Sequence, residues 1–236
     1  FKLAKIPKIA LIGNPNAGKS SLFNTLTGLR QKTGNFPGVT MDKLTGIWEL
    51  GPKNEIEILD LPGIYSIYPK SIDEELVINI LGNPAHPDYP DMAIVVADAS
   101  NLKRNLLLFS QVRDLGIPTV LALNMIDVAE NEGYVINSIK LARELSVEVA
   151  EVNAKKGIGV NGLKLSVQKT LENRFASNDG LPLPVSDELI DEIQAAFGEV
   201  DPYRCLLWLM EHDRMKMFTK TQCDVLDQIT VKHSFE

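Results

Sequence analysis

Residues 8–20 read KIALIGNPNAGKS, and this stretch decides the fold. Its opening part, residues 8–12, is a short and mainly apolar run, which is typical of a buried strand. Gly13 to Ser20 then match the pattern GxxxxGKS/T of a phosphate-binding loop, which requires a strand before it and a helix after it. Helical spacing over residues 19–27 meets the second requirement. The stretch therefore predicts a nucleotide-binding domain of the α/β class.

The chemistry of this loop follows from its residue types. Glycines allow the backbone to curl, so that successive N–H groups and the start of the next helix point at phosphates. Lys19 is expected to reach the β and γ phosphates, and the Ser20 hydroxyl to bind Mg²⁺. We assign a run of consecutive residues to this phosphate site: Asn14, Pro15, Asn16, Ala17, Gly18, Lys19, Ser20 and Ser21.

Short apolar runs alternate with helical patterns as far as residue 172. We expect strands at residues 8–12, 44–50, 55–60, 92–97, 119–124 and 147–152, and helices at 19–27, 72–81, 102–115, 135–145 and 162–171. This order predicts an α/β domain with a mostly parallel six-stranded sheet between helices. Residues 50–54 are too short for a crossover helix, so the second and third strands should form an antiparallel hairpin.

Composition places the chain among folded proteins. It has 236 residues, of which 44% are hydrophobic, and a formal net charge of −7, which argues against nucleic acid as a partner. Residues 176–185, ASNDGLPLPV, read as a linker. We therefore predict a nucleotide-binding domain over 1–175 and a small all-helical domain over 183–236. We expect the chain as given to be soluble.

Two further motifs are expected to select the base. In Asn124-Met125-Ile126-Asp127, the Asp127 carboxylate can accept hydrogen bonds from N1–H and the 2-amino group of guanine, a donor pair that adenine lacks. Asn124 is expected to bind the purine N7 and to tie its loop to the phosphate loop. After the last strand come Asn153, Ala154 and Lys155, where the Ala154 N–H is expected to meet the guanine O6.

Two segments are expected to contact the γ-phosphate. Asp60, at the end of a strand, can hold the metal through water, and the Gly63 N–H can sense the phosphate. Thr40 follows Gly38 in a polar segment, and it can offer a hydroxyl to Mg²⁺ and a carbonyl to the attacking water. We assign the catalytic roles to Thr40, Gly63, Lys19 and Asn16.

Taken together, GNPNAGKS, NFPGVT, DLPG, NMID and NAKKG look like the motifs of a translation-factor-class GTPase. With LFN, LTG and DLPGIYS they resemble the N-terminal GTPase region of FeoB, the bacterial ferrous-iron transporter. The resemblance implies a Ras-like P-loop fold, a GDI-like or spacer helical domain, GTP and GDP as ligands, and a role in gating ferrous-iron uptake. It further implies a membrane channel portion of the same polypeptide, the cytoplasmic face of the inner membrane and small cytosolic Feo partners, and it allows a homo-oligomer.

One position departs from many small GTPases, which carry a glutamine directly after the DxxG glycine. Ile64 stands there in this chain, and a hydrocarbon cannot orient water, so slow intrinsic hydrolysis is expected. Resemblance to potassium-activated relatives implies that Asn16, with the carbonyls of Gly34 and Phe36, holds K⁺ against the phosphates.

Two other functions stay open at this point. Similar loops occur in GTPases that assemble ribosomes or bind RNA, although the acidic C-terminal helices do not favour that role; a nucleotide sensor without hydrolysis is the other.

The remaining charged side chains are not assigned to the site. We expect Arg104 and Arg113 to be solvated charges. His86, His212 and His233 are scattered, without carboxylate or cysteine partners at metal-ligand spacing, so no iron or zinc site is expected.

Overall fold

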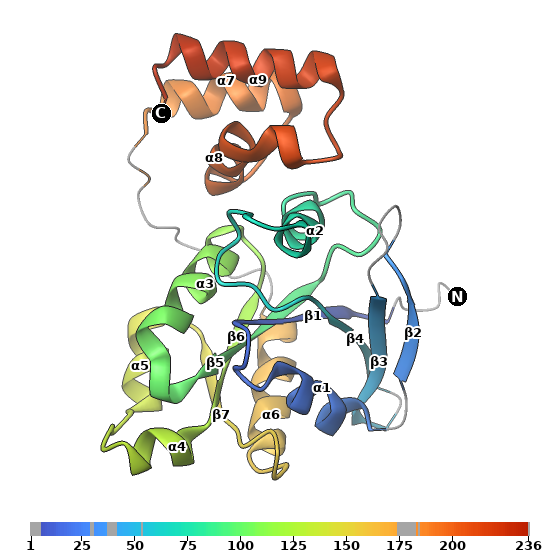
Figure 1. Ribbon diagram of the computed structural model, residues 1–236, viewed down its shortest axis with the longest axis vertical. Coiled ribbons are helices and arrows are strands. Elements are labelled where there is room, and N and C mark those ends of the chain that lie inside the picture. Colours follow the sequence, from blue (N-terminus) through green and yellow to red (C-terminus); the bar gives the residue numbers. More distant parts are fainter. Residues whose placement is uncertain are drawn as a thin grey trace. The chain divides into compact units, whose positions relative to one another are not determined.

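The computed structural model describes residues 6–28, 31–36, 42–52, 54–173, 183 and 185–235. The chain divides into two units (Figure 1). The first consists of Phe1–Ser66, Pro90–Arg113 and Ile117–Ala176, and the second of Ile67–Tyr89, Asp114–Gly116 and Ser177–Glu236. Most of the predicted linker, at 176–182 and 184, lies outside the described residues. The predicted domain bounds of 1–175 and 183–236 stay a prediction.

A single sheet forms the centre of the first unit (Figure 1). Its strand order is β2-β3-β4-β1-β5-β6-β7. The strands are β1 (Lys8–Gly13), β2 (Gln31–Asn35), β3 (Asp42–Gly51), β4 (Asn54–Asp60), β5 (Met92–Asp98), β6 (Thr119–Asn124) and β7 (Glu148–Glu151). Strands β4, β1, β5, β6 and β7 run parallel, so their carboxyl ends, where the sequence motifs lie, meet at one edge of the sheet.

The number of strands corrects the sequence prediction. The antiparallel hairpin of β3 and β4 is confirmed, but the described residues contain seven strands where six were expected. The missed strand is β2, whose five residues QKTGN are all exposed and show no apolar alternation. It exists because its backbone pairs antiparallel with β3, for example Thr33 with Leu44. Pairing of this kind leaves no hydrophobic pattern in the sequence.

Helices cover the sheet of the first unit. They are α1 (Lys19–Thr27), α3 (Leu102–Asp114), α4 (Ile126–Asn131), α5 (Ser138–Leu145) and α6 (Val160–Glu172), with a 3₁₀ turn η1 (Ala99–Asn101) before α3. Apolar residues of α1 and α6, such as Phe23 and Leu163, share a buried cluster with alternate strand residues such as Leu11 and Ile94. The short helix α4 was not predicted from the sequence. These packed layers hold the strand ends, and therefore the motif loops, in place.

The regular elements in the described part of the second unit are all helices. It contains α2 (Ile72–Leu81), α7 (Asp187–Phe197), α8 (Pro202–Glu211), the 3₁₀ turn η2 (His212–Arg214) and α9 (Lys220–Lys232). Side chains cap the helix starts: Ser71 for α2, Asp201 for α8, and a capping box of Thr219 and Gln222 for α9. In the core of this unit, the rings of Phe197, Trp208 and Phe218 pack edge to face at 5.3–5.9 Å.

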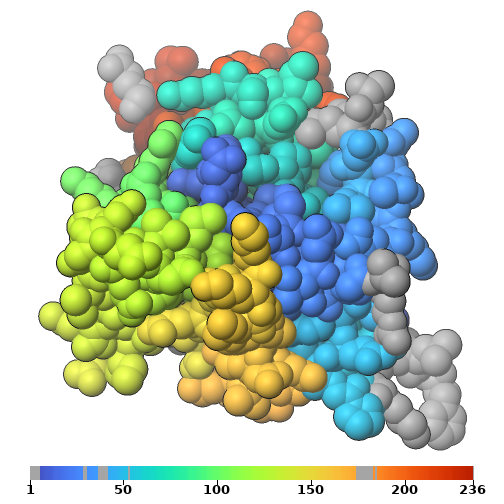
Figure 2. All heavy atoms as spheres, turned by 60° about the horizontal axis from the view of Figure 1, so that its bottom comes forward, coloured from blue at the N-terminus to red at the C-terminus, as the bar shows by residue number. Residues whose placement is uncertain are grey.

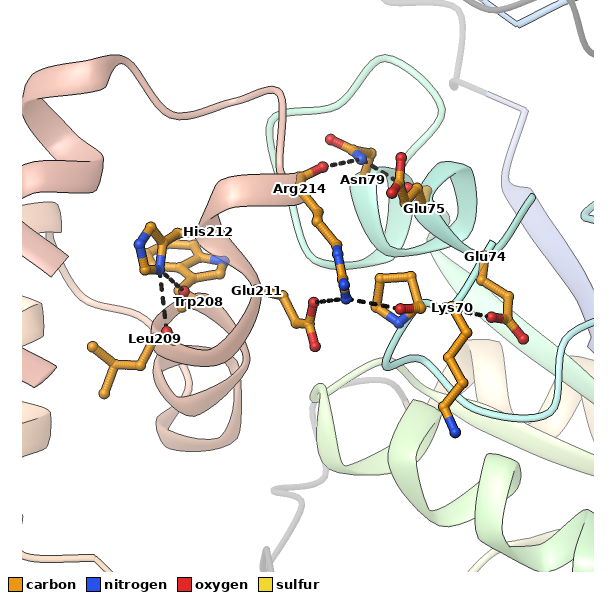
Figure 3. A network of polar contacts seen from close by, with 10 residues as sticks. Lys70, Glu74, Glu75, Asn79, Trp208, Leu209, Glu211, His212 and Arg214 are labelled. Carbon is orange, nitrogen blue, oxygen red and sulfur yellow. Dashed lines mark hydrogen bonds and ion pairs between the residues drawn. The ribbon is translucent and has the colours of Figure 1, made fainter. Parts of the chain in front are cut away.

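Helix α2 is joined to the C-terminal helices of the second unit by polar contacts (Figure 3). The Asn79 amide donates to the Arg214 carbonyl at 2.9 Å and accepts from the Lys216 N–H at 2.6 Å. Arg214 donates to the Pro69 carbonyl at 2.8 Å, and Trp208 Nε1 donates to the Gly82 carbonyl at 3.0 Å. The segment that follows the DLPG motif in sequence therefore packs, from residue 67 onward, with helices more than a hundred residues later.

No helix among the described residues is both long enough and apolar enough to cross a bilayer.

Candidate functional site

The phosphate-binding loop connects β1 to α1 and is held by its own backbone. Gly18 is the residue before the helix and has φ +86°, while Asn16 has φ +67°. The Ala17 N–H donates to the Asn14 carbonyl at 3.1 Å. A Cβ on Gly18 would lie 2.1 Å from Asn124 Nδ2, so a side chain is excluded both by backbone conformation and by space.

Asn124 links the loop that follows β6 to the phosphate loop. Its side chain is buried, and its Nδ2 donates to the Ala17 carbonyl at 2.9 Å. Its Oδ1 accepts from the Ala154 N–H at 3.0 Å. One amide therefore joins the three loops that follow β1, β6 and β7, and the predicted tie between the loops of Asn124 and Ala17 is present.

The Ala154 backbone is held by two neighbouring segments. Its N–H donates to Asn124 Oδ1, and the expected contact of this N–H with a guanine O6 stays a prediction. The carbonyl of Ala154 accepts from Thr25 Oγ1 of α1 at 2.7 Å, a contact that the sequence did not indicate. Figure 2 shows the loop around residue 155, in yellow, beside the blue surface of α1. Thr25 and Asn124 thus hold this loop from two sides.

Asp127 is the second residue of the short helix α4, which follows Met125 with its φ of +61°. Its Oδ2 accepts from Asn153 Nδ2 at 3.0 Å and from Lys156 Nζ at 3.2 Å. The hydrogen bond from Lys156 is the main reason that the pKa of Asp127 lies below its ordinary value. The carboxylate is 46% exposed and ionised at neutral pH, so it can accept hydrogen bonds from a ligand. Lys156 was not predicted; Lys155 was, and it is exposed.

Lys19 and Asp60 form an ion pair at the bottom of the site. Lys19 Nζ donates to Asp60 Oδ1, and each side chain is only 11% exposed. Burial raises the pKa of Asp60 and outweighs the opposite effect of Lys19. A buried carboxylate of this kind gains from a second cation nearby. The phosphate-loop lysine and the candidate metal-binding aspartate therefore lie together, and their roles toward phosphate and metal stay predictions.

The segment after Asp60 runs alongside β1. The Leu61 N–H donates to the Leu11 carbonyl at 3.1 Å, and the Ile64 N–H donates to the Gly13 carbonyl at 3.2 Å. Gly63 is exposed between them, and a Cβ there would lie 3.3 Å from the Pro15 backbone. The Ile64 side chain is fully buried. Ile64, which directly follows the DxxG glycine, therefore offers no polar side-chain atom to a water molecule.

The roles of the remaining predicted site residues stay predictions. Thr40 and Gly38 lie outside the described residues. Ser20, Ser21 and Asn16 are exposed at the start of α1 and on the loop before it. Gly34 lies on β2, and Phe36 directly follows that strand with a buried ring, so their assignment to a K⁺ site stays a prediction. The Asn14 amide is buried and has no hydrogen-bond partner within the described part of the chain.

Side chains outside the site make contacts that the sequence did not indicate. Arg104 is stacked on Tyr65, with its guanidinium carbon 3.8 Å from the ring centre, and Arg113 Nη1 donates to the Leu145 carbonyl at 3.3 Å. Arg104 is exposed, as a solvated charge should be, whereas Arg113 is half-buried. His212 and His233 do have carboxylate neighbours, Asp227 at 3.2 Å and Glu192 at 2.8 Å, brought close by the folding of the helices. The described residues contain no group of three ligating side chains suited to a metal ion.

Comparison with known proteins identifies the family. Residues 7–167 match the family model described as Ferrous iron transport protein B. The chain belongs to the FeoB family. The Fe(2+) transporter FeoB of Leptospira biflexa is 42% identical over 165 residues, which cover 70% of this chain and 23% of the relative. FeoB of Escherichia coli K12 is 38% identical over 198 residues, covering 82% and 23%.

Solved FeoB structures share the fold. The cytosolic domain of L. pneumophila FeoB matches with a TM-score of 0.77 at 33% identity, covering 95% of this chain and 89% of that one. An S. thermophilus NFeoB mutant bound to GDP matches with a TM-score of 0.72 at 33% identity, covering 97% and 90%. The predicted Ras-like P-loop fold is therefore confirmed. The chain spans about a quarter of the length of the curated FeoB relatives.

Proposed function

We propose that this chain is the nucleotide-switch part of a bacterial ferrous-iron transporter, and that it binds GTP with Mg²⁺ and hydrolyses it to GDP and phosphate. The observation that carries the proposal is the Asn124 side chain, which holds the phosphate loop at Ala17 and the last motif loop at Ala154 in one assembly. A phosphate-binding and a base-binding element held at fixed separation can recognise a whole nucleotide. Membership of the FeoB family favours the transport role over an RNA-assembly role.

The residues present fit Mg²⁺. Ser20 offers a hydroxyl and Asp60 a carboxylate, which are the hard oxygen donors that this ion prefers. When bound, the ion neutralises charge on the β and γ phosphates. Lys19 would turn from Asp60 to the phosphates, which would leave the Asp60 carboxylate to help hold Mg²⁺. Thr40 supplies a further hydroxyl in this proposal.

Hydrolysis requires a water molecule in line with the bond between the γ-phosphorus and the bridging oxygen. The Gly63 N–H and the Thr40 carbonyl are the groups we propose to orient it, because the Ile64 side chain is buried and has no polar atom. The backbone can position water but cannot add charge, so intrinsic turnover is slow. Loss of the γ-phosphate then frees Gly63 and Thr40, and this change is the signal sent to the rest of the transporter.

The proposed output is regulation of ferrous-iron passage through a membrane portion of the same polypeptide, at the cytoplasmic face of the inner membrane. Small cytosolic Feo proteins and further copies of the transporter are the proposed partners, and nucleic acid is not one. Calorimetry with GTP, GDP and ATP in the presence of Mg²⁺ tests the nucleotide step. Guanine nucleotides should bind and ATP should not; equal binding of ATP, or no binding at millimolar concentration, contradicts the proposal.

Asp60→Asn tests the metal site. We expect Mg²⁺ to support nucleotide retention about 10- to 100-fold more weakly, the usual effect of removing a partner that holds a metal through water. A Mg²⁺ titration of fluorescent GDP release measures the change. Asp73→Asn, in the exposed first turn of α2, serves as the control and should leave the titration unaltered. An unchanged Mg²⁺ requirement in Asp60→Asn removes Asp60 from the site.

The proposed K⁺ site is tested by salt substitution. A cation held by Asn16 and the carbonyls of Gly34 and Phe36 would add positive charge beside the phosphates as bond breaking begins. We expect the hydrolysis rate to be at least about tenfold higher in KCl than in NaCl at equal ionic strength. Asn16→Ala should remove the difference. Equal rates of the unchanged chain in the two salts argue against the site.

A further inference from the structure

Hydrogen bonds hold the corner between β5 and α3, where that helix begins. The buried amide of Asn105 donates to the Asn101 carbonyl at 2.8 Å and accepts from the Asp98 N–H at 3.2 Å. Asp98 Oδ1 in turn accepts from the N–H of Ser100 at 2.9 Å and from its hydroxyl at 2.8 Å. Arg104 precedes Asn105, so its backbone is held by these contacts.

From this fixed position Arg104 reaches the segment that follows the DLPG motif. Its guanidinium carbon lies 3.8 Å from the centre of the Tyr65 ring, well within the range of a cation–π contact. Both residues belong to the first unit, which the chain leaves after Ser66. Tyr65 is therefore almost the last residue of the segment that is anchored to the nucleotide-binding unit.

Four contacts hold the segment on both sides of Gly63. Before it, the Leu61 N–H is bound to β1; after it, the Ile64 N–H is bound to Gly13 and the Ile64 side chain is buried. The contact of the Tyr65 ring with Arg104 is the last of these contacts along the chain. Gly63, the residue with the proposed γ-phosphate contact, lies between these held residues. It has no side chain that could make a contact of its own.

We propose that Arg104 is a positioning residue for GTP hydrolysis: through the Tyr65 ring it holds the Ile64 backbone, and thereby the Gly63 N–H, in place. The effect on catalysis rests on the proposed function. The restraint on the backbone is independent of it. Arg104 touches no reacting atom. Its contribution is modest, because Tyr65 is 39% exposed and solvent weakens a cation–π pair.

Amide hydrogen exchange tests the restraint without any nucleotide. Local opening governs exchange, so losing a weak surface contact should raise the rate at Ile64 by about two- to fivefold in Arg104→Ala. The buried amide of Val95 on β5 should be unchanged. Arg104→Lys, which keeps a cation, and Tyr65→Phe, which keeps a ring, should restore most of the protection. Lys103→Ala removes a neighbouring exposed cation and is the matched control.

Steady-state hydrolysis tests the catalytic consequence. We expect Arg104→Ala and Tyr65→Leu each to lower kcat about two- to fivefold with KM and GDP affinity unchanged, because GDP lacks the γ-phosphate. The double variant should lose no more than either single variant. Additive losses, an equal loss in Lys103→Ala, or unchanged exchange at Ile64 would overturn the proposal. If the unchanged chain did not hydrolyse GTP, the proposed function would fail, and the exchange result would still decide the restraint.

Discussion

Asp127→Asn is expected to lower GTP affinity by at least about 100-fold and to create affinity for xanthosine triphosphate. The carboxylate accepts two hydrogen bonds from guanine in the proposed complex, and an asparagine amide can accept only one of them. Xanthine carries a carbonyl where guanine has its amino group, so the new amide donor gains a partner there. Asp127 is half exposed, so the loss should fall below the roughly 10⁴- to 10⁵-fold discrimination of fully buried hydrogen-bonding sites.

Competition binding with both triphosphates measures this exchange of specificity. Lys156→Ala is the matched control, because it removes the lysine that donates to Asp127 but leaves the carboxylate able to accept from guanine. It should weaken GTP binding far less and should not admit xanthosine triphosphate. Retained preference for GTP in Asp127→Asn would show that another residue selects the base.

Gly18→Ala should have the other large effect, and it should act on folding and binding together. The new Cβ would lie 2.1 Å from Asn124 Nδ2, and the residue would keep a φ near +86°. Asn124 would have to move and lose its bonds to Ala17 and Ala154. Backbone strain and two lost buried hydrogen bonds together cost about 3–5 kcal/mol. The melting temperature should fall by about 10 °C.

Gly133→Ala separates the two causes of that loss. Gly133 has φ +85°, almost the same as Gly18, but a Cβ there meets nothing within 4 Å. The Gly133→Ala variant should therefore lose only the stability that backbone strain costs, about 1 kcal/mol. Its nucleotide binding should be intact. Gly18→Ala should in addition lose nucleotide affinity by at least about 100-fold, because the two loops are no longer linked. Similar melting temperatures for the two variants would mean that the link through Asn124 contributes little.

Local pattern in the sequence determined the strands and helices that carry the motifs. Helix α2 was predicted with its observed bounds, since its apolar residues recur at helical spacing. The phosphate loop and the Asn124 motif were placed because each follows a buried strand, and parallel strand ends share one edge. Such features depend on residues a few positions apart, and the sequence shows them directly.

Only the tertiary structure decided the contacts between distant segments. Strand β2 depends on pairing with β3, Thr25 reaches Ala154 across 129 positions, and Arg104 meets Tyr65 across the surface of the first unit. The use of the Ala154 N–H by Asn124 belongs to the same group. None of these contacts produces a periodic pattern in the sequence, because each depends on how packed layers bring two side chains or backbones together. Hydrophobic pattern and loop motifs thus specify the elements of the site, whereas close packing in three dimensions sets which of their polar groups meet.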